Sequence, residues 1–183
     1  MPLKKYGIAP LLLLALALPP CSEAYSPPQG APQEFQLKAV FVLSFAKLTE
    51  WPEDLHAEGA SFMIAIVGKE PPAPFINTLK GQTVHGAKVS VRQIEEVSEA
   101  KGAHLVYITT SERHRITVIL RELNQQNILT VSDMAGFCEA GGMIGLVPVQ
   151  NRLGFEVNLS SVRKARLTVS SQLLKLARTI FGN

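Results

Sequence analysis

The residues that could do chemistry are few, and their spacing does not group them. None of the four histidines has metal-ligand spacing to another histidine or to Cys138. Ser132, His104 and Asp133 are the residue types of a serine-hydrolase triad. No nucleophile-elbow motif surrounds Ser132, however, and adjacent residues on a strand point to opposite faces. His104 opens the apolar run HLVYI and is expected to be a hydrogen-bonded structural histidine. The sequence therefore predicts neither an enzyme nor a metal site.

A glycine-rich segment, Gly141-Gly142-Met143-Ile144-Gly145, is the one candidate for phosphate binding. Phosphate sites of this kind need a helix N-terminus after the glycines, whereas this segment leads into an apolar strand. A turn whose glycines allow positive φ explains it better. We predict no cofactor.

Four polar side chains follow stretches that are typical of buried strands. They are Lys69, Thr109, Ser111 and Asp133. The carboxyl ends of parallel strands meet at one edge of a sheet, and ligands bind there at the point where the strand order reverses. These side chains could therefore line a pocket for a small polar ligand. The alternative is that they are ordinary turn and cap residues, with Ser111 capping the next helix and Asp133 capping a short one.

The elements that would position these residues alternate along the chain. Apolar or alternating runs predict six strands, at residues 62–67, 89–91, 104–108, 128–131, 143–149 and 153–159. Helical patterns cover residues 33–51, 75–79, 94–100, 111–126, 134–139 and 160–181. Together they predict an α/β three-layer sandwich with helices on both faces. Its six-stranded sheet would be mostly parallel, in the order 2-1-3-4-5-6, with the last two strands as an antiparallel edge hairpin.

The N-terminal segment reads as a signal peptide. Lys4 and Lys5 precede an apolar run over residues 8–18, and Ser22-Glu23-Ala24 offers a cleavage site. We expect residues 1–24 to be removed near Ala24, residues 25–32 to form a flexible linker, and residues 33–183 to form one domain. A lipid anchor at Cys21 is the weaker alternative, because Pro20 replaces the small residue that such an anchor needs. No later apolar run is long enough to cross a bilayer, so we expect no transmembrane segment in the mature chain.

Cleavage there would leave Cys138 as the only thiol, so no internal disulfide is expected. Cys138 is then either a small apolar residue of the interior or a reactive thiol. The charge is uneven as well: six Lys or Arg residues and one acidic residue fall between positions 152 and 183. For an exported protein this basic segment indicates a solvated face, an acidic partner or an anionic membrane surface, and not a nucleic acid.

Five segments, in this order along the chain, carry a family resemblance. They are residues 37–52 (LKAVFVLSFAKLTEWP), 104–108 (HLVYI), 129–144 (LTVSD, then Phe137 and GGMI), 155–158 (FEVN) and 170–178 (SSQLLKLAR). Taken together they resemble the YfiR-like family of exported bacterial regulators. The matched residues look mainly structural, and they include Trp51, His104, Ser132, Asp133, Gly141, Gly142, Glu156, Asn158 and Ser171.

The resemblance implies a non-enzymatic periplasmic protein that represses an inner-membrane diguanylate cyclase by binding its periplasmic sensor part. It also implies possible sequestration by an outer-membrane, peptidoglycan-associated lipoprotein. A homodimer is plausible. Relatives often carry a cysteine where this chain has Ala103, so disulfide control within one chain is not expected here. The alternative function is a small-molecule sensor that uses the pocket at the strand ends.

Overall fold

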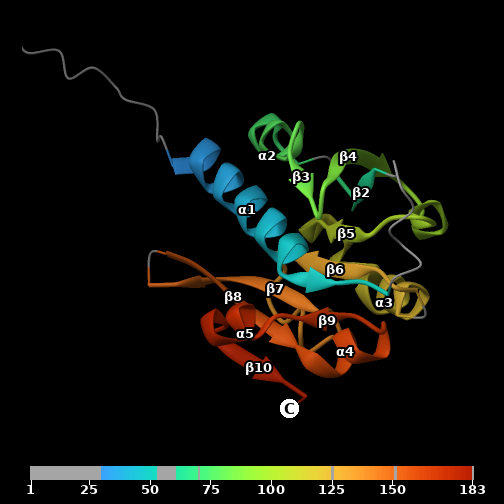
Figure 1. The fold of residues 1–183 in the computed structure, drawn as a ribbon. Coiled ribbons are helices and arrows are strands. Elements are labelled where there is room, and N and C mark those ends of the chain that lie inside the picture. Colours follow the sequence, from blue (N-terminus) through green and yellow to red (C-terminus); the bar gives the residue numbers. More distant parts are fainter. Residues whose placement is uncertain (1–29, 53–60, 70, 125, 151, 183) are drawn as a thin grey trace, which may run out of the picture.

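Two β-sheets organise the computed structural model, which describes residues 30–52, 61–69, 71–124, 126–150 and 152–182 (Figure 1). The larger sheet contains β2 (Phe62–Val67), β3 (Thr83–Val84), β4 (Ala87–Ile94), β5 (Leu105–Ile108), β6 (Leu129–Ser132), β7 (Ile144–Val149), β8 (Arg152–Asn158) and β10 (Thr179–Phe181). The smaller sheet pairs β1 (Thr49–Glu50) with β9 (Thr168–Val169). The expected signal peptide, its cleavage at Ala24, Cys21 and linker residues 25–29 lie outside the described residues.

The larger sheet has the strand order β10-β8-β7-β6-β5-β2-β4-β3. Strands β4, β2, β5, β6 and β7 run parallel, and β8 returns antiparallel to β7 as a hairpin. The α/β class is confirmed, and the six expected strands lie in the expected order. The number of strands is wrong, because β3 and β10 add one short strand at each edge. At two and three residues, these strands are too short to show a periodic pattern.

Helices cover both faces of the sheet. One face carries α1 (Gly30–Lys47), α2 (Ala73–Leu79), α4 (Leu159–Lys164) and α5 (Ser171–Leu176). The other carries the 3-10 helices η2 (Val97–Ala100) and η3 (Thr110–Arg115), with α3 (Ile116–Leu123). Neighbouring residues of β2 show the division: Ile64 and Ile66 belong to the first apolar core, and Ala65 and Val67 to the second. Among the described residues, no helix has the length and hydropathy that a membrane span needs.

Helix α1 is the largest element of the first layer and starts earlier than predicted. It begins at Gly30, so residues 30–32, which were expected in the linker, are helical; Pro32 falls in the first turn, where a proline costs no hydrogen bond. Its buried face includes Val42 and Phe45, and the Phe45 ring lies 5.0 Å from the ring of Phe155 in β8. The helix is thus anchored across the hairpin.

The C-terminal region differs most from the prediction. A single bent helix over residues 160–181 was expected, but the chain forms α4, β9, α5 and β10. Arg166 has φ of 55°, which ends α4, and Leu167 and Val169 then enter the core. Ser170 restarts the chain as a helix, because its Oγ accepts a hydrogen bond from Leu173 N–H at 3.2 Å.

Two shorter helices and one helix cap were also predicted wrongly. Residues 134–139 were expected to form a helix, but residues 135–140 form turns, with Gly136 at φ of 76°. The helix expected over 94–100 is reduced to η2, because Ile94 still belongs to β4. Ser111 does not cap the next helix: the 3-10 helix starts at Thr110, and Thr109 holds the cap position.

Candidate functional site

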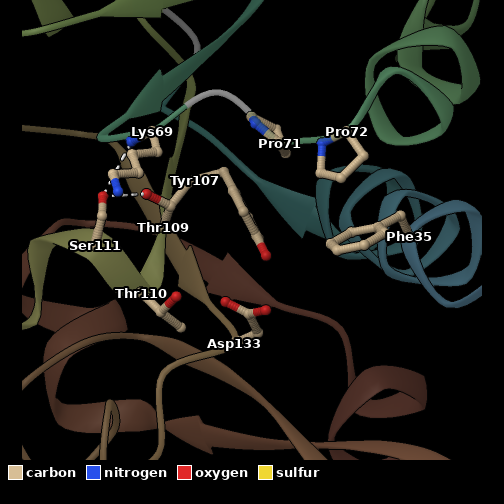
Figure 2. A pocket seen from close by; sticks show the side chains of 9 residues that line it. All are labelled: Phe35, Lys69, Pro71, Pro72, Tyr107, Thr109, Thr110, Ser111 and Asp133. Carbon is tan, nitrogen blue, oxygen red and sulfur yellow. Dashed lines mark hydrogen bonds between the residues drawn. The ribbon is translucent and has the colours of Figure 1, made fainter. Parts of the chain in front are cut away.

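A pocket of 340 Å³ opens at the carboxyl ends of β2, β5 and β6 (Figure 2). It is lined by Phe35, Lys69, Pro71, Pro72, Tyr107, Thr109, Thr110, Ser111 and Asp133. All four residues expected from the strand ends are in this lining. The pocket lies at the switch point of the sheet, because β2 has the later strand β4 on one side and β5 on the other. Binding of a ligand there remains a prediction.

The rim of the pocket is fixed by hydroxyl groups. Lys69 N–H donates to Ser111 Oγ at 3.0 Å, and Ser111 Oγ lies 2.9 Å from Thr109 Oγ1. Thr109 Oγ1 in turn donates to the Val67 carbonyl at 3.2 Å. Gly68 lies between these groups at φ of 98°, and a Cβ there would overlap with both hydroxyl oxygens. The hydroxyls therefore fasten the ends of β2 and β5 together, so this part of the rim is structural.

An ion pair closes the inner wall. Lys38 of α1 is only 8% exposed, and its Nζ lies 2.8 Å from Asp133 Oδ2 and 2.7 Å from Glu34 Oε1. The same ammonium lies 5.2 Å from the centre of the Phe35 ring. Burial alone would lower the pKa of Lys38, but the hydrogen bonds to Asp133 and Glu34 outweigh burial and raise it. Asp133 is thus the ion-pair partner of a buried lysine, and not the helix cap that was the alternative.

Tyr107 of β5 supplies the floor. Its side chain is buried, and its ring lies 4.7 Å from the Phe75 ring of α2. Burial raises the pKa of the Tyr107 hydroxyl, and the negative charge of Asp133 and a hydrogen bond to it raise the pKa further. Figure 2 shows the hydroxyl ending near the Asp133 carboxylate. The phenol therefore stays protonated and remains a hydrogen-bond donor.

Sequence reasoning missed Lys38 and Tyr107. Lys38 precedes the buried residues Val42 and Phe45 by four and seven positions, so it lies on the apolar face of its own helix. A charged residue on such a face needs a partner, and that signal was available. Tyr107 was counted only as an apolar residue of a buried strand.

The residues of the hypothetical triad do not come together. His104 precedes β5 at the amino end of the sheet, where its Nδ1 accepts a hydrogen bond from Met63 N–H at 3.1 Å. Ser132 ends β6 at the carboxyl edge, and its Oγ donates to the Ile108 carbonyl at 2.7 Å. Among the residues that the structure describes, no group of three or more His, Cys, Asp or Glu side chains could hold a metal ion.

The motif glycines shape the turn before β7. Gly141 has φ of 100°, and a Cβ on Gly142 would overlap with the Phe137 ring. Asn158 fixes the same turn, because its Nδ2 donates to the Cys138 carbonyl at 2.9 Å while its Oδ1 accepts from Ser161 N–H at 3.0 Å. These residues hold the hairpin and the start of α4 in register.

The other motif residues also lie away from the pocket. Trp51 is buried, and its Nε1 donates to the His104 carbonyl at 3.2 Å. Glu156 is half-buried in β8, opposite Thr179 of β10. Ser171 is the exposed first residue of α5, and its neighbour Ser170 makes the cap.

Cys138 is a residue of the interior. It is buried, its Sγ lies 3.8 Å from the Met143 carbonyl, and burial raises the pKa of the thiol to about 12. The thiolate, which is the reactive form, is therefore scarce at neutral pH.

A second hollow, which the sequence did not predict, lies between α1 and α5. This apolar groove of 280 Å³ is lined by Val40, Phe41, Ser44, Phe45, Leu48, Phe155, Leu173 and Leu176. Val40 is 48% exposed and Leu176 is 68% exposed. A neighbouring hollow shares Leu176 and adds Arg152 and Arg178. Among the residues that the structure describes, neither lining contains an acidic side chain.

Comparison with known proteins gives one family and a shared fold. The model of the YfiR/HmsC-like family matches residues 35–178. A conserved domain protein from Vibrio cholerae O1 biovar El Tor strain N16961 is similar in structure, with a TM-score of 0.55 over 80% of this chain and 10% sequence identity. An ABC domain from Streptococcus pneumonia in complex with L-Trp has a TM-score of 0.51 over 80% of the chain and 9% identity.

At these identities the two solved structures show the fold alone, and this chain covers 60% of the length of each. The family match is of a different kind, because it begins within α1, ends just after α5, and includes both the pocket and the groove. It confirms the resemblance that the five sequence segments carry. The chain belongs to the YfiR/HmsC-like family.

Proposed function

We propose that this protein is a non-enzymatic periplasmic regulator that represses an inner-membrane diguanylate cyclase by binding its periplasmic sensor part. The observation that carries the proposal is the family membership over residues 35–178. The expected signal peptide agrees with the location. Repression needs no chemistry: the protein binds the inactive state of the sensor more tightly than the active state, and so shifts the population of the cyclase.

The apolar groove between α1 and α5 is the surface that suits this role. Monomeric proteins rarely leave apolar side chains gathered in a hollow unless something covers them. Val40 and Leu176 stand at its surface, and the buried ring of Phe155 forms part of its floor. Such a groove accommodates a few apolar side chains of a partner, which lose their contact with water on binding.

The charge around the groove indicates the chemistry of the partner. Arg152 and Arg178 line the adjoining hollow, and Lys175 lies in the exposed part of α5. We therefore infer that the occupant is an apolar segment of the sensor with acidic residues beside it, since opposite charges steer association and fix orientation. A second copy of this chain would bring like charges together at this surface.

Two exposed valines provide a matched test. Val40 in the groove is 48% exposed, and Val118 of α3, on the opposite face of the sheet, is 45% exposed. Val40→Glu places a carboxylate in the groove and should abolish binding to the purified periplasmic part of the cyclase. Val118→Glu changes the charge equally and should bind normally. In cells, deletion of the gene should raise cyclic di-GMP and biofilm formation, and Val40→Glu should act like the deletion.

Two outcomes would contradict the proposal. Unchanged cyclic di-GMP after deletion, in a strain that carries the cognate cyclase, would argue against repression itself. Equal loss of binding with both valine variants would argue against the groove. Light scattering tests whether a second copy of this chain occupies the groove instead. If the wild type is a homodimer and Val40→Glu is a monomer, the groove is the dimer interface. The outer-membrane lipoprotein would relieve repression by competing for the groove, which a three-component binding assay measures.

A further inference from the structure

We propose that the pocket at the carboxyl ends of β2, β5 and β6 binds a small ligand that carries a primary ammonium group beside an apolar group, and that Asp133 receives the ammonium. The proposal does not rest on the regulatory function above, because the site is built inside this chain. It concerns the inner end of the pocket, where Asp133, Tyr107 and Phe35 meet (Figure 2).

The protein itself shows which chemistry this corner accepts. The Lys38 ammonium lies 2.8 Å from Asp133 Oδ2 and 5.2 Å from the centre of the Phe35 ring. A carboxylate and an aromatic face are the two groups that hold an ammonium in a partly dry site. Both Asp133 and Phe35 also line the cavity. An ammonium that enters from the cavity therefore meets the groups that Lys38 already uses.

Lys38 can give up Asp133 without losing its only partner. Glu34 lies one turn earlier on the same helix, 2.7 Å from the Lys38 ammonium, and its side chain is 57% exposed. When a ligand takes Asp133, Lys38 keeps this second ion pair and its charge moves toward water. The exchange thus leaves no charge buried and unpaired, which is the arrangement that costs most.

The remaining walls favour an apolar group on the ligand. Pro71 is buried, Pro72 and the Phe35 ring lie beside it, and the hydroxyls of Thr109 and Ser111 are already bonded to one another and to the strand ends. At 340 Å³ the pocket has the size for a ligand of about one ring, at the lower end of the usual range of roughly 300–1,000 Å³. Among the described residues of the lining, Asp133 is the only acidic one, and it is the group that would pair with an ammonium.

Lys69 is the cation on the rim, and its charge distinguishes two classes of ligand that carry the same ammonium group. Its side chain is exposed, so water and salt screen its charge. A free amine would use Asp133 alone, whereas an amino acid would also place its carboxylate near Lys69. Both carry the ammonium that the proposal requires.

Calorimetric titration of the purified protein separates these cases with three compounds that share one ring. We expect 2-phenylethylamine and phenylalanine to bind, and 3-phenylpropionate, which has no ammonium, not to bind. Tighter binding of phenylalanine than of 2-phenylethylamine would identify the amino acid as the source, and the reverse would identify the free amine. Binding of 3-phenylpropionate as tight as that of the amines, or no binding of either amine at millimolar concentration, would overturn the proposal.

Three variants test the residue assignment. Asp133→Asn should lower the affinity for 2-phenylethylamine by about ten- to hundredfold, which is the range for a charge-assisted hydrogen bond. Glu139→Gln removes an exposed carboxylate outside the pocket and should change nothing. Lys38→Met removes the competing ammonium and should tighten binding. Its circular dichroism and melting curve show whether the variant is folded.

A folded Lys38→Met variant that binds more weakly than the wild type would contradict the exchange and overturn the proposal. The readout uses the purified protein without a cyclase. Failure here is therefore distinct from failure of the regulatory function.

Discussion

Helix α1 contributes to both hollows of the molecule, but by different means. At the pocket, Lys38 reaches the strand ends through an ion pair, and the hydroxyls of Thr109 and Ser111 hold the rim. At the groove, Val40 and Phe41 meet α5 and β8 through apolar contact alone. The pocket depends on charge and backbone geometry, whereas the groove depends on packed rings that are continuous with the core. Substitutions at the two sites should therefore lower the free energy of unfolding by different amounts and for different reasons.

The largest effect is expected at the groove floor. Phe155→Ala should lower the free energy of unfolding by about 3–5 kcal/mol, because it leaves a cavity where rings now pack. The Phe155 ring lies 5.0 Å from the Phe45 ring and 6.0 Å from the Phe41 ring. Urea denaturation of variant and wild type measures the loss. Leu153→Ala, at a half-buried position of the same strand, should cost less, and equal costs would contradict a floor that belongs to the core.

The next largest effect is expected at the pocket rim. Gly68→Ala should cost about 2–3 kcal/mol, because its φ of 98° disfavours any side chain and a Cβ would overlap with Thr109 Oγ1 and Ser111 Oγ. Gly81→Ala is the matched control: φ is 75°, but nothing lies within 4 Å of the added Cβ. It should cost only about 1 kcal/mol. Equal melting temperatures of the two variants would show that the rim is not crowded.

The ion pair between Lys38 and Asp133 should contribute less to the free energy of unfolding than the groove floor or the pocket rim. It should contribute only in a defined pH range. Lys38 has a pKa above its ordinary value of 10.5 in the folded protein, so its stabilisation is complete below that value. The stabilisation should disappear as the pH rises through the folded pKa. Lys38→Met should therefore cost about 2 kcal/mol near neutral pH and progressively less at higher pH. A difference between wild type and variant that stays constant up to strongly alkaline pH would contradict this assignment.

The pocket could be predicted in large part from the sequence, and the groove could not. Apolar runs end where buried strands end, so Lys69, Thr109, Ser111 and Asp133 fall at one edge of any parallel sheet that these runs build. The order of the strands in the sheet was predicted from the same runs. The position of Lys38 on the apolar face of its helix was a local signal, but its partner Asp133 is 95 residues away and no local pattern identifies that partner.

The groove depends on how residues 160–181 fold, and their local pattern is misleading. The apolar spacing there fits a helix, but the chain breaks to form two short strands. Thr168 pairs with Glu50 in β1, and Thr179 pairs with Glu156 in β8. These pairings are fixed by tertiary contacts, which override weak helix propensity over so few residues. Without that break, Leu176 could not be placed beside Val40.

The smallest effect on stability should accompany a large effect on binding. Leu176 is 68% exposed at the edge of the groove, so Leu176→Ser removes little buried surface and should change the free energy of unfolding by less than about 0.5 kcal/mol. In the complex the same side chain would be covered by the sensor segment, and its loss should weaken binding by about tenfold or more. Val118→Ser, at an exposed apolar residue of α3, should alter neither quantity. Denaturation curves and calorimetric titration against the periplasmic part of the cyclase measure the two effects on the same samples.

If Leu176→Ser unfolds the protein as readily as Phe155→Ala, α5 belongs to the core and not to an interface. If it leaves both stability and affinity unchanged, the partner binds elsewhere, and the contrast between a charged pocket and an apolar docking groove is wrong.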